Sequence, residues 1–194
     1  MKNQPALSTP MLRNDLQQSL NRSQIDPSAL STFQRILLTT NGTVTDMLEA
    51  YFWEPIQLVK LSEELVKSDR EFLPLELKPG TEVIERRILL RGSISRKNYI
   101  YAESLILLDN LDEHFRNELL KNQTPIGKIW LEKRVETFKE IIDSGKYPAN
   151  ELAPYFNIEP SENLLFRTYC VVSNLKYTMM ITEKFPESYF LKKF

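Results

Sequence analysis

The chain has 194 residues, enough for one globular domain with a sizeable core. Its 25 basic and 26 acidic residues give a formal net charge of -1, so composition gives no reason to expect nucleic acid or an anionic membrane as a partner. The single cysteine, Cys170, excludes an internal disulfide, and together with the lone histidine, His114, it is too little for a zinc site. We therefore expect no bound metal.

The first 25 residues are polar and contain Pro5 and Pro10, without the apolar core of a signal peptide. No run approaches the ~20 apolar residues that a helix needs to span a bilayer. We expect a loosely ordered N-terminal segment over residues 1–25, a single domain over residues 26–194, and a cytoplasmic protein with no membrane span.

Helix and strand signals alternate along the first half of the chain. Asp26-Pro27-Ser28 predicts the start of a helix that ends before Asn41-Gly42, and Thr43 opens a second helix that Pro55 ends. Residues 55–61 alternate as a strand, and residues 62–69 are predicted to form a short helix. Residues 82–91 and 98–108 follow as a predicted antiparallel hairpin.

The second half begins with a predicted helix over residues 112–121. Thr124 and Pro125 mark the start of another helix, which is predicted to run to Ile142. Residues 147–161 contain three prolines and are predicted to be mostly loop. Residues 164–172 and 177–185 form a second predicted hairpin. The predicted fold class is α+β, an antiparallel sheet of about six strands with inserted helices.

Two charged residues, Arg86 and Glu183, lie on strand faces that are otherwise apolar. Side chains alternate between the two faces of a strand. On that basis the neighbours on the face of Arg86 are Ile84, Ile88 and Leu90, and those on the face of Glu183 are Met179, Ile181 and Phe185. Burying an ionised group is costly unless it is paired or hydrogen-bonded. A cation and an anion placed in this way indicate the walls of a buried polar pocket.

An alternative interpretation places Arg86 on an edge strand and Glu183 near a strand end, both reaching water, because strand phase is easily misread by one residue. In the pocket interpretation, the planar fork of Arg86 suits a carboxylate. Glu183 would accept a hydrogen bond from a hydroxyl, or donate a proton if burial favours its neutral form. The helix starts at residues 43–45 and 125–127 would add backbone N–H donors for an oxygen-bearing ligand.

Five short motifs follow one another over roughly residues 30–187. They are Asn41-Gly42-Thr43-Val44-Thr45-Asp46-Met47-Leu48, Arg86-Arg87-Ile88-Leu89-Leu90, Tyr101-Ala102-Glu103-Ser104, Thr124-Pro125-Ile126-Gly127 and Ile181-Thr182-Glu183-Lys184-Phe185-Pro186. In this order they resemble the chorismate lyases, most of all the branch found in cyanobacteria, plastids and some actinobacteria.

The resemblance implies an antiparallel sheet with helical flaps that close over a ligand. It implies that the protein splits chorismate into 4-hydroxybenzoate and pyruvate without metal or cofactor, as a first step toward quinones or phenolic compounds. It also implies that Arg86 binds the ring carboxylate and that Glu183 bonds the 4-oxygen of the product or the ether oxygen of the substrate. Val44 and Ile126 would contribute backbone N–H groups from the flaps.

The chain departs from the enterobacterial branch at Ser104, where that branch carries an arginine near the pocket, which implies a difference in ligand entry or release. The longer N-terminus and the insert over residues 147–161 receive no role from the resemblance. A rival function is a non-enzymatic domain of the same fold that binds a small aromatic acid, as in the ligand-sensing domains of one class of bacterial repressors. A second rival is a structural protein whose pocket is only a core.

Overall fold

The computed structural model describes residues 25–69, 71–72, 75–113, 115–117, 126, 132 and 136–191. Within these residues, six strands form one antiparallel sheet in the order β1-β2-β3-β6-β5-β4. The strands are β1 (Ile56–Lys67), β2 (Glu82–Gly92), β3 (Asn98–Leu107), β4 (Phe138–Pro148), β5 (Asn163–Ser173) and β6 (Lys176–Pro186). The sheet confirms the predicted α+β class and both predicted hairpins, β2–β3 and β5–β6.

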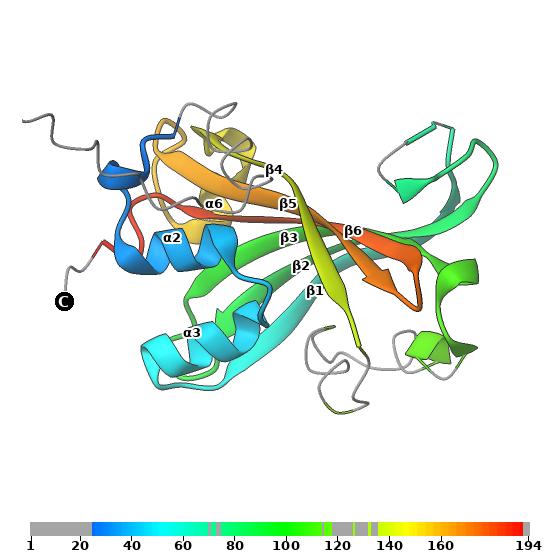
Figure 1. Ribbon diagram of the computed structural model, residues 1–194. Coiled ribbons are helices and arrows are strands. Elements are labelled where there is room, and N and C mark those ends of the chain that lie inside the picture. Colours follow the sequence, from blue (N-terminus) through cyan, green and yellow to red (C-terminus); the bar gives the residue numbers. More distant parts are fainter. Residues whose placement is uncertain are drawn as a thin grey trace, which may run out of the picture.

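Two helices, α2 (Thr32–Thr39) and α3 (Val44–Phe52), lie against one face of this sheet (Figure 1). The continuous helix predicted from Asp26 is wrong, because a short 3-10 turn, η1 (Pro27–Ala29), precedes α2. The break arises at Ser31, whose side chain accepts a hydrogen bond from the backbone of Gln34 while the Gln34 side chain bonds back to Ser31. This reciprocal cap starts a new helix. The second helix ends as predicted, before Pro55.

Two other predictions were wrong. Residues 62–67 are not helical but continue β1, and residues 138–142 belong to β4 rather than to a helix that ends at Ile142. Both are edge strands with many polar residues, and each is interrupted by a bulge, at Lys60/Ser62 and at Ile141/Asp143. A bulge changes which face a residue occupies, so the alternation on which a strand prediction depends is lost.

The remaining helical segments are short. They are η3 (Leu108–Asn110), η4 (Asn150–Leu152) and α6 (Ala153–Phe156), the last two within the stretch predicted to be mostly loop. The helix predicted at 112–121 is seen at residues 113 and 115–117. His114, residues 1–24 and the helix start at 124–127, except Ile126, lie outside the described residues.

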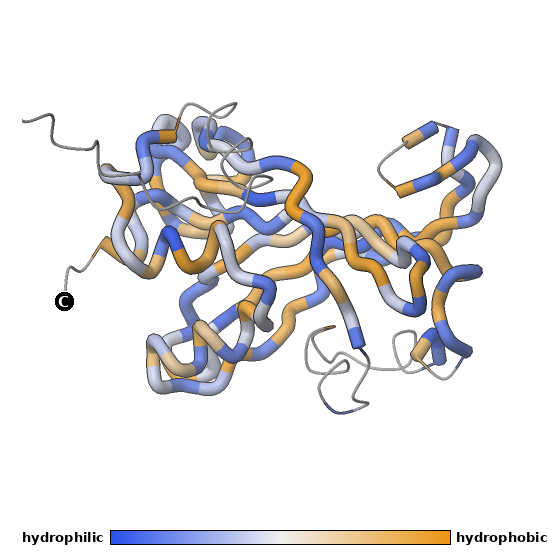
Figure 2. Tube along the Cα trace, in the orientation of Figure 1, coloured by the Kyte–Doolittle hydropathy of each residue, from blue (hydrophilic) through white to orange (hydrophobic). Residues whose placement is uncertain are grey.

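The main core fills the space between the sheet and the two helices. Apolar residues recur along the central strands (Figure 2), and Ile84 and Leu90 of β2 share one buried cluster with Leu37 and Leu48 of the helices. A smaller cluster includes Cys170, where burial raises the pKa of the thiol to about 12. No helix in the described ranges is both long and apolar enough to cross a membrane.

Aromatic stacking and one amide attach the two helices to the rest of the molecule. The rings of Phe33 and Tyr51 stack at 4.0 Å and join α2 to α3, and those of Phe52 and Tyr99 stack at 3.9 Å and join α3 to β3. The side chain of Gln34 donates to the backbone oxygens of residues 187 and 189 at 2.8 and 3.0 Å. These contacts fix the loop between the helices over the sheet.

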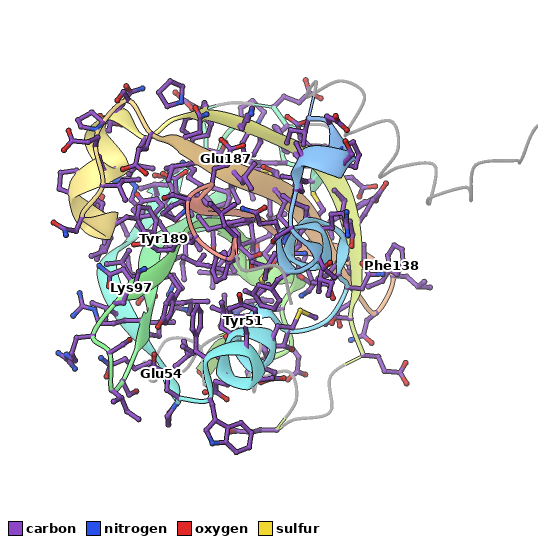
Figure 3. All side chains as sticks on the ribbon, turned by 90° about the vertical axis from the view of Figure 1, so that its left-hand side faces the viewer. Tyr51, Glu54, Lys97, Phe138, Glu187 and Tyr189 are labelled. Atoms are coloured by element: carbon purple, nitrogen blue, oxygen red, sulfur yellow. The ribbon has the colours of Figure 1, made fainter. Side chains whose placement is uncertain are left out.

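A buried carboxylate, Glu54, locks the far end of α3 (Figure 3). It accepts hydrogen bonds from the backbone N–H groups of Ile94 and Ser95 at 2.9 Å and from the Ser95 and Tyr99 hydroxyls at 2.7 Å. The hydrogen bonds, led by the one from the Ser95 backbone, lower the pKa of Glu54 to about 2. The β2–β3 turn therefore holds α3 in place and with it the helix start that faces the sheet.

Candidate functional site

A cavity lies on the helix-covered face of the sheet, beside the start of α3. Its walls are formed by Thr43, Val44, Thr45, Leu58, Arg86, Ile88, Leu90, Ala102, Ser104, Ile126, Lys139, Tyr169, Ile181 and Glu183. The centres of water-sized molecules have about 60 Å³ available in it, which is room for a few waters, since one water needs roughly 10–15 Å³ on this measure. The four residues that the sequence singled out, Val44, Arg86, Ile126 and Glu183, all line this one cavity.

Arg86 is buried at one end of the cavity. It stands on β2, an interior strand, so the edge-strand interpretation is wrong, and its side chain is 1% exposed. Its Nε atom lies 3.4 Å from Oε2 of Glu63 on β1. Among the described residues, none of its three guanidinium nitrogens has a hydrogen-bond partner. Burial lowers the pKa of Arg86, and the charge of Glu63 opposes this shift. A dry guanidinium fork with open donors is suited to a carboxylate.

Glu63 is the resident anion at this end. Its other oxygen, Oε1, accepts a hydrogen bond from Lys60 at 2.6 Å. Glu63 could not be identified from the sequence, because residues 62–69 were predicted to be helical. In the strand that the structure shows, Glu63 pairs across the ladder with Arg86.

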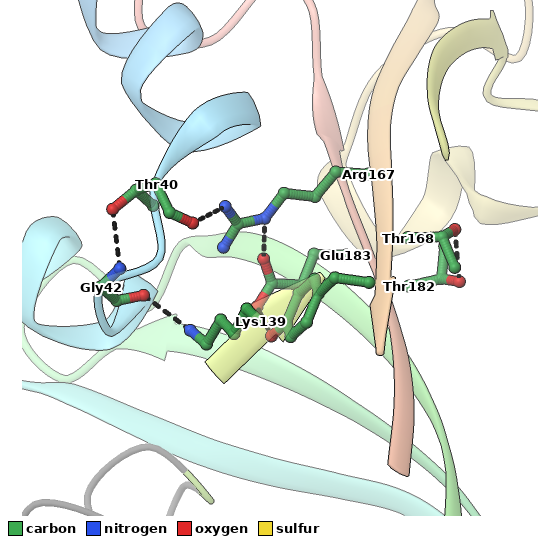
Figure 4. A network of polar contacts seen from close by, with 8 residues as sticks. Thr40, Gly42, Lys139, Arg167, Thr168, Thr182 and Glu183 are labelled. Carbon is green, nitrogen blue, oxygen red and sulfur yellow. Dashed lines mark hydrogen bonds and ion pairs between the residues drawn. The ribbon is translucent and has the colours of Figure 1, made fainter. Parts of the chain in front are cut away.

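Glu183 is buried toward the other side of the cavity, in a hydrogen-bonded network (Figure 4). Its Oε2 accepts from Nε of Arg167 at 2.7 Å, and its Oε1 accepts from the Tyr169 hydroxyl at 2.9 Å. Arg167 is its direct cross-strand neighbour. Burial raises the pKa of Tyr169 well above its ordinary value, so this hydroxyl keeps its proton and remains a donor. Both carboxylate oxygens are therefore engaged as acceptors.

The same network reaches the loop between the two helices. Arg167 donates through Nη1 to the carbonyl oxygen of Thr40 at 2.8 Å, and Lys139 of β4 donates to that of Gly42 at 2.7 Å (Figure 4). Burial lowers the pKa of Lys139 to about 8, with Glu183 opposing the shift. Cations from two strands thus hold the loop that leads into α3.

The start of α3 completes the wall above the sheet. Thr43 caps the helix by position, but its side chain makes no capping hydrogen bond. The N–H groups of a first helical turn have no partner within the helix. Val44 is the first residue of α3 and lines the cavity, so this polar end of the helix lies at the cavity wall. Ile126 is helical and buried against the same space. Its sequence neighbours lie outside the described residues.

The sequence could have revealed one of the residues that it missed. Arg167 alternates with the buried Leu165, Tyr169 and Val171, which is the same pattern that identified Arg86. Lys139 gave no such signal, because its segment was predicted to be a helix.

The middle of the cavity is apolar and its two ends are not. The backbones of Arg86 on β2 and Glu183 on β6 are separated by β3 and offset by two residues along the strands, which places them roughly 12 Å apart at the usual strand spacing and rise. Apolar residues, chiefly Ile88, Ala102 and Ile181, lie between them. This arrangement can hold a small ring that carries a carboxylate at one end and an oxygen at the other.

Comparison with known proteins agrees with the resemblance carried by the sequence motifs. A family profile with the description "Chorismate pyruvate-lyase Rv2949c-like" matches residues 38–193. The chorismate pyruvate-lyase of Mycobacterium leprae is 33% identical over 159 residues, which cover 80% of this chain and 75% of that protein.

Solved structures of transcriptional regulators resemble the fold. The effector domain of PhnF from Mycobacterium smegmatis aligns with a TM-score of 0.59 at 7% identity, over 75% of this chain and 88% of that one. The ligand-binding domain of a GntR-family regulator from Bordetella bronchiseptica aligns with a TM-score of 0.52 at 14% identity, over 67% and 82% of the two chains. At such identities the likeness shows the fold alone.

Replacing Glu63 with Gln tests the environment of Arg86. We expect Glu63→Gln to lower the free energy of unfolding by about 1–3 kcal/mol, because the buried guanidinium of Arg86 loses the anion that lies 3.4 Å from its Nε atom. Benzoate should then raise the melting temperature more in the variant than in the wild type, because it meets no competing carboxylate. Thermal unfolding with and without benzoate measures both effects. The exposed neighbour gives a matched control, Glu64→Gln, and equal benzoate shifts in all three proteins would contradict the interpretation.

Proposed function

Because the chain belongs to the Rv2949c-like chorismate pyruvate-lyase family, we propose that this cavity is the place where it eliminates pyruvate from chorismate and leaves 4-hydroxybenzoate. The observation that carries the proposal is the buried Arg86 fork, with open donors, at one end of an apolar chamber whose other end holds Glu183. An enzyme of this family is a lyase, and the cavity offers its substrate a carboxylate site and an oxygen site in one space.

The reaction itself requires little covalent chemistry from the protein. Chorismate carries a carboxylate on ring carbon 1, an enolpyruvyl ether on carbon 3 and a hydroxyl on carbon 4. Elimination breaks the bond between carbon 3 and the ether oxygen and removes the hydrogen on carbon 4. The released enolpyruvate gains one proton on its methylene carbon to become pyruvate, and the ring becomes aromatic. The protein must orient the ring and stabilise charge that develops on the leaving oxygen.

Arg86 would bind the ring carboxylate. Its Nη1 and Nη2 atoms can donate to both oxygens at once, in the bidentate geometry that guanidinium and carboxylate groups favour. The backbone N–H groups at Val44 and Ile126 would assist from the covering helices. The ring would lie over Ala102 and Ile181, where it excludes water and strengthens every polar contact around it.

Glu183 would act as a hydrogen-bond acceptor for the 4-hydroxyl of the ring. Its two oxygens already accept from Arg167 and Tyr169, and each carboxylate oxygen has capacity for a further donor. A role as proton donor would place a proton on an oxygen that now faces Arg167 or Tyr169. Of the two roles that the sequence left open, the contacts favour the acceptor.

Several finer statements are part of the proposal. The motif order favours the cyanobacterial and plastid branch, with 4-hydroxybenzoate passing to quinone or phenolic synthesis in the cytoplasm. Ser104 lines the cavity at the position that carries arginine in the enterobacterial branch, so we expect ligand entry or release to differ from that branch.

The direct test incubates purified protein with chorismate and follows pyruvate with lactate dehydrogenase, while mass spectrometry with an isomer-resolving separation identifies the aromatic product. We expect stoichiometric pyruvate and 4-hydroxybenzoate. Binding of chorismate without release of pyruvate would instead support the non-enzymatic binding domain.

Arg86→Ala should abolish turnover and weaken 4-hydroxybenzoate binding by about 2–4 kcal/mol, the scale of a lost buried charged hydrogen bond. Calorimetric titration measures the affinity. Arg87→Ala is the matched control, because this neighbouring arginine is largely exposed on a strand residue of opposite orientation. Near-normal product affinity in Arg86→Ala would rule out the assignment of the carboxylate end.

Glu183→Gln separates binding from proton donation. The amide keeps the shape but loses the negative charge and one acceptor, so we expect slower turnover and a weaker hold on the 4-hydroxyl. Steady-state kinetics with chorismate, paired with the affinity for benzoate, which lacks that hydroxyl, shows where the loss arises. Turnover equal to that of the wild type would exclude a proton-donating Glu183.

A further inference from the structure

Lys139 lines the cavity but is not one of the residues that would hold the ring. It stands on β4, the last strand of the sheet, and its side chain is buried. Behind it, the guanidinium of Arg167 is 1% exposed and donates through Nε and Nη1, while its Nη2 atom has no hydrogen-bond partner in the part of the chain that the structure describes. Buried donors of this kind usually have a partner.

The order of the strands places these cations beyond Glu183. From Arg86 on β2, the sheet continues through β3 to Glu183 on β6, then to Arg167 on β5 and Lys139 on β4. A ligand that extends from Arg86 across the cavity therefore meets Glu183 first and Lys139 afterwards. The ammonium of Lys139 also donates to the carbonyl oxygen of Gly42, just before the start of α3.

Among the described residues, two cations lie near each carboxylate of this region. They are Lys60 and Arg86 near Glu63, and Lys139 and Arg167 near Glu183. Asp46 of α3, which is exposed to solvent, also acts on Lys139. The Glu183 end thus places two buried cations beside one buried carboxylate.

Chorismate carries one carboxylate on its ring and a second on the enolpyruvyl group, which leaves as pyruvate. If the ring carboxylate lies on Arg86 and the 4-hydroxyl on Glu183, the enolpyruvyl group on the adjacent carbon 3 projects from the side of the ring at the Glu183 end. We propose that Lys139, with Arg167 behind it, forms a second carboxylate site that binds the enolpyruvyl carboxylate of the substrate. This inference rests on the proposed function and assigns the part of the substrate that the product lacks.

A lysine that binds substrate and a lysine with a purely structural role would affect ligand binding differently. A lysine that only ties β4 to Gly42 would affect every ligand of the cavity alike. A lysine that binds the leaving carboxylate affects chorismate, which has that group, and spares 4-hydroxybenzoate, which does not.

The test compares Lys139→Met with the wild type at neutral pH. We expect the KM for chorismate to rise by about 10- to 100-fold, as for the loss of one charged hydrogen bond, while the dissociation constant for 4-hydroxybenzoate changes less than about threefold. Retained product binding also shows that the variant is folded. Lys146→Met on the same strand is the matched control, since its ammonium lies 3.2 Å from Glu187 and is half exposed, and we expect wild-type values from it.

Two results would overturn the inference: an unchanged KM for chorismate in Lys139→Met, or an equal loss of affinity for chorismate and 4-hydroxybenzoate. Either can occur while the wild-type protein still releases pyruvate from chorismate, so they are distinct from a failure of the proposed function, which would show as no pyruvate from the wild type.

A pH series gives a second readout that needs no variant. The pKa of Lys139 lies at about 8, and the groups that face it are Glu183 of β6, Arg167 and Tyr169 of β5 and Asp46 of α3. As pH rises from 7 to 9, Lys139 loses its proton and the KM for chorismate should rise. The affinity for benzoate, which carries only one carboxylate and does not titrate in this range, should stay constant. A KM that is flat, or that rises together with the dissociation constant for benzoate, would contradict the second site.

Discussion

The arrangement of the cavity and of the helix loop above it depends on three cations that are buried on one face of the β-sheet. Taking a charge out of water costs several kcal/mol unless the protein or a ligand compensates, and Arg86, Lys139 and Arg167 are all buried. Arg167 and Lys139 find protein oxygens, among them the carbonyls of Thr40 and Gly42. The loop that carries the start of α3 is therefore held over the sheet by the same cations that surround the cavity.

Of these three cations, Arg86 has the fewest hydrogen-bond partners among the described residues. It has Glu63 at 3.4 Å and no hydrogen bond among the described residues, whereas Glu183 has a donor on each oxygen. Before a ligand arrives, all three nitrogens of Arg86 thus lack a hydrogen-bond partner within the described residues, whereas at the Glu183 end only Nη2 of Arg167 does. Binding energy from an incoming carboxylate is concentrated at Arg86, as expected where a functional site departs from the most stable arrangement. The fold alone does not determine this arrangement of charges, because the same fold can carry different sites. The likeness to the regulator domains is a likeness of architecture only.

Much of the fold followed from the sequence, because its central strands alternate clearly. The four interior strands were found within about one residue of their observed ends, and Arg86 and Glu183 were assigned to the correct faces. The errors in the two strands that were mispredicted share one cause. Both edge strands, β1 and β4, carry polar residues and a bulge that breaks the period of two. Glu63 and Lys139 lie on these strands, so the sequence missed the counter-ion of Arg86 and the cation beyond Glu183.

A crystal structure with 4-hydroxybenzoate bound would show whether the ring lies between Arg86 and Glu183. We expect the carboxylate of the ligand within hydrogen-bond distance of the Arg86 guanidinium and its hydroxyl within the same reach of Glu183, with Ile181 against the ring. A ligand bound in the reverse direction, or outside the cavity, would contradict this placement.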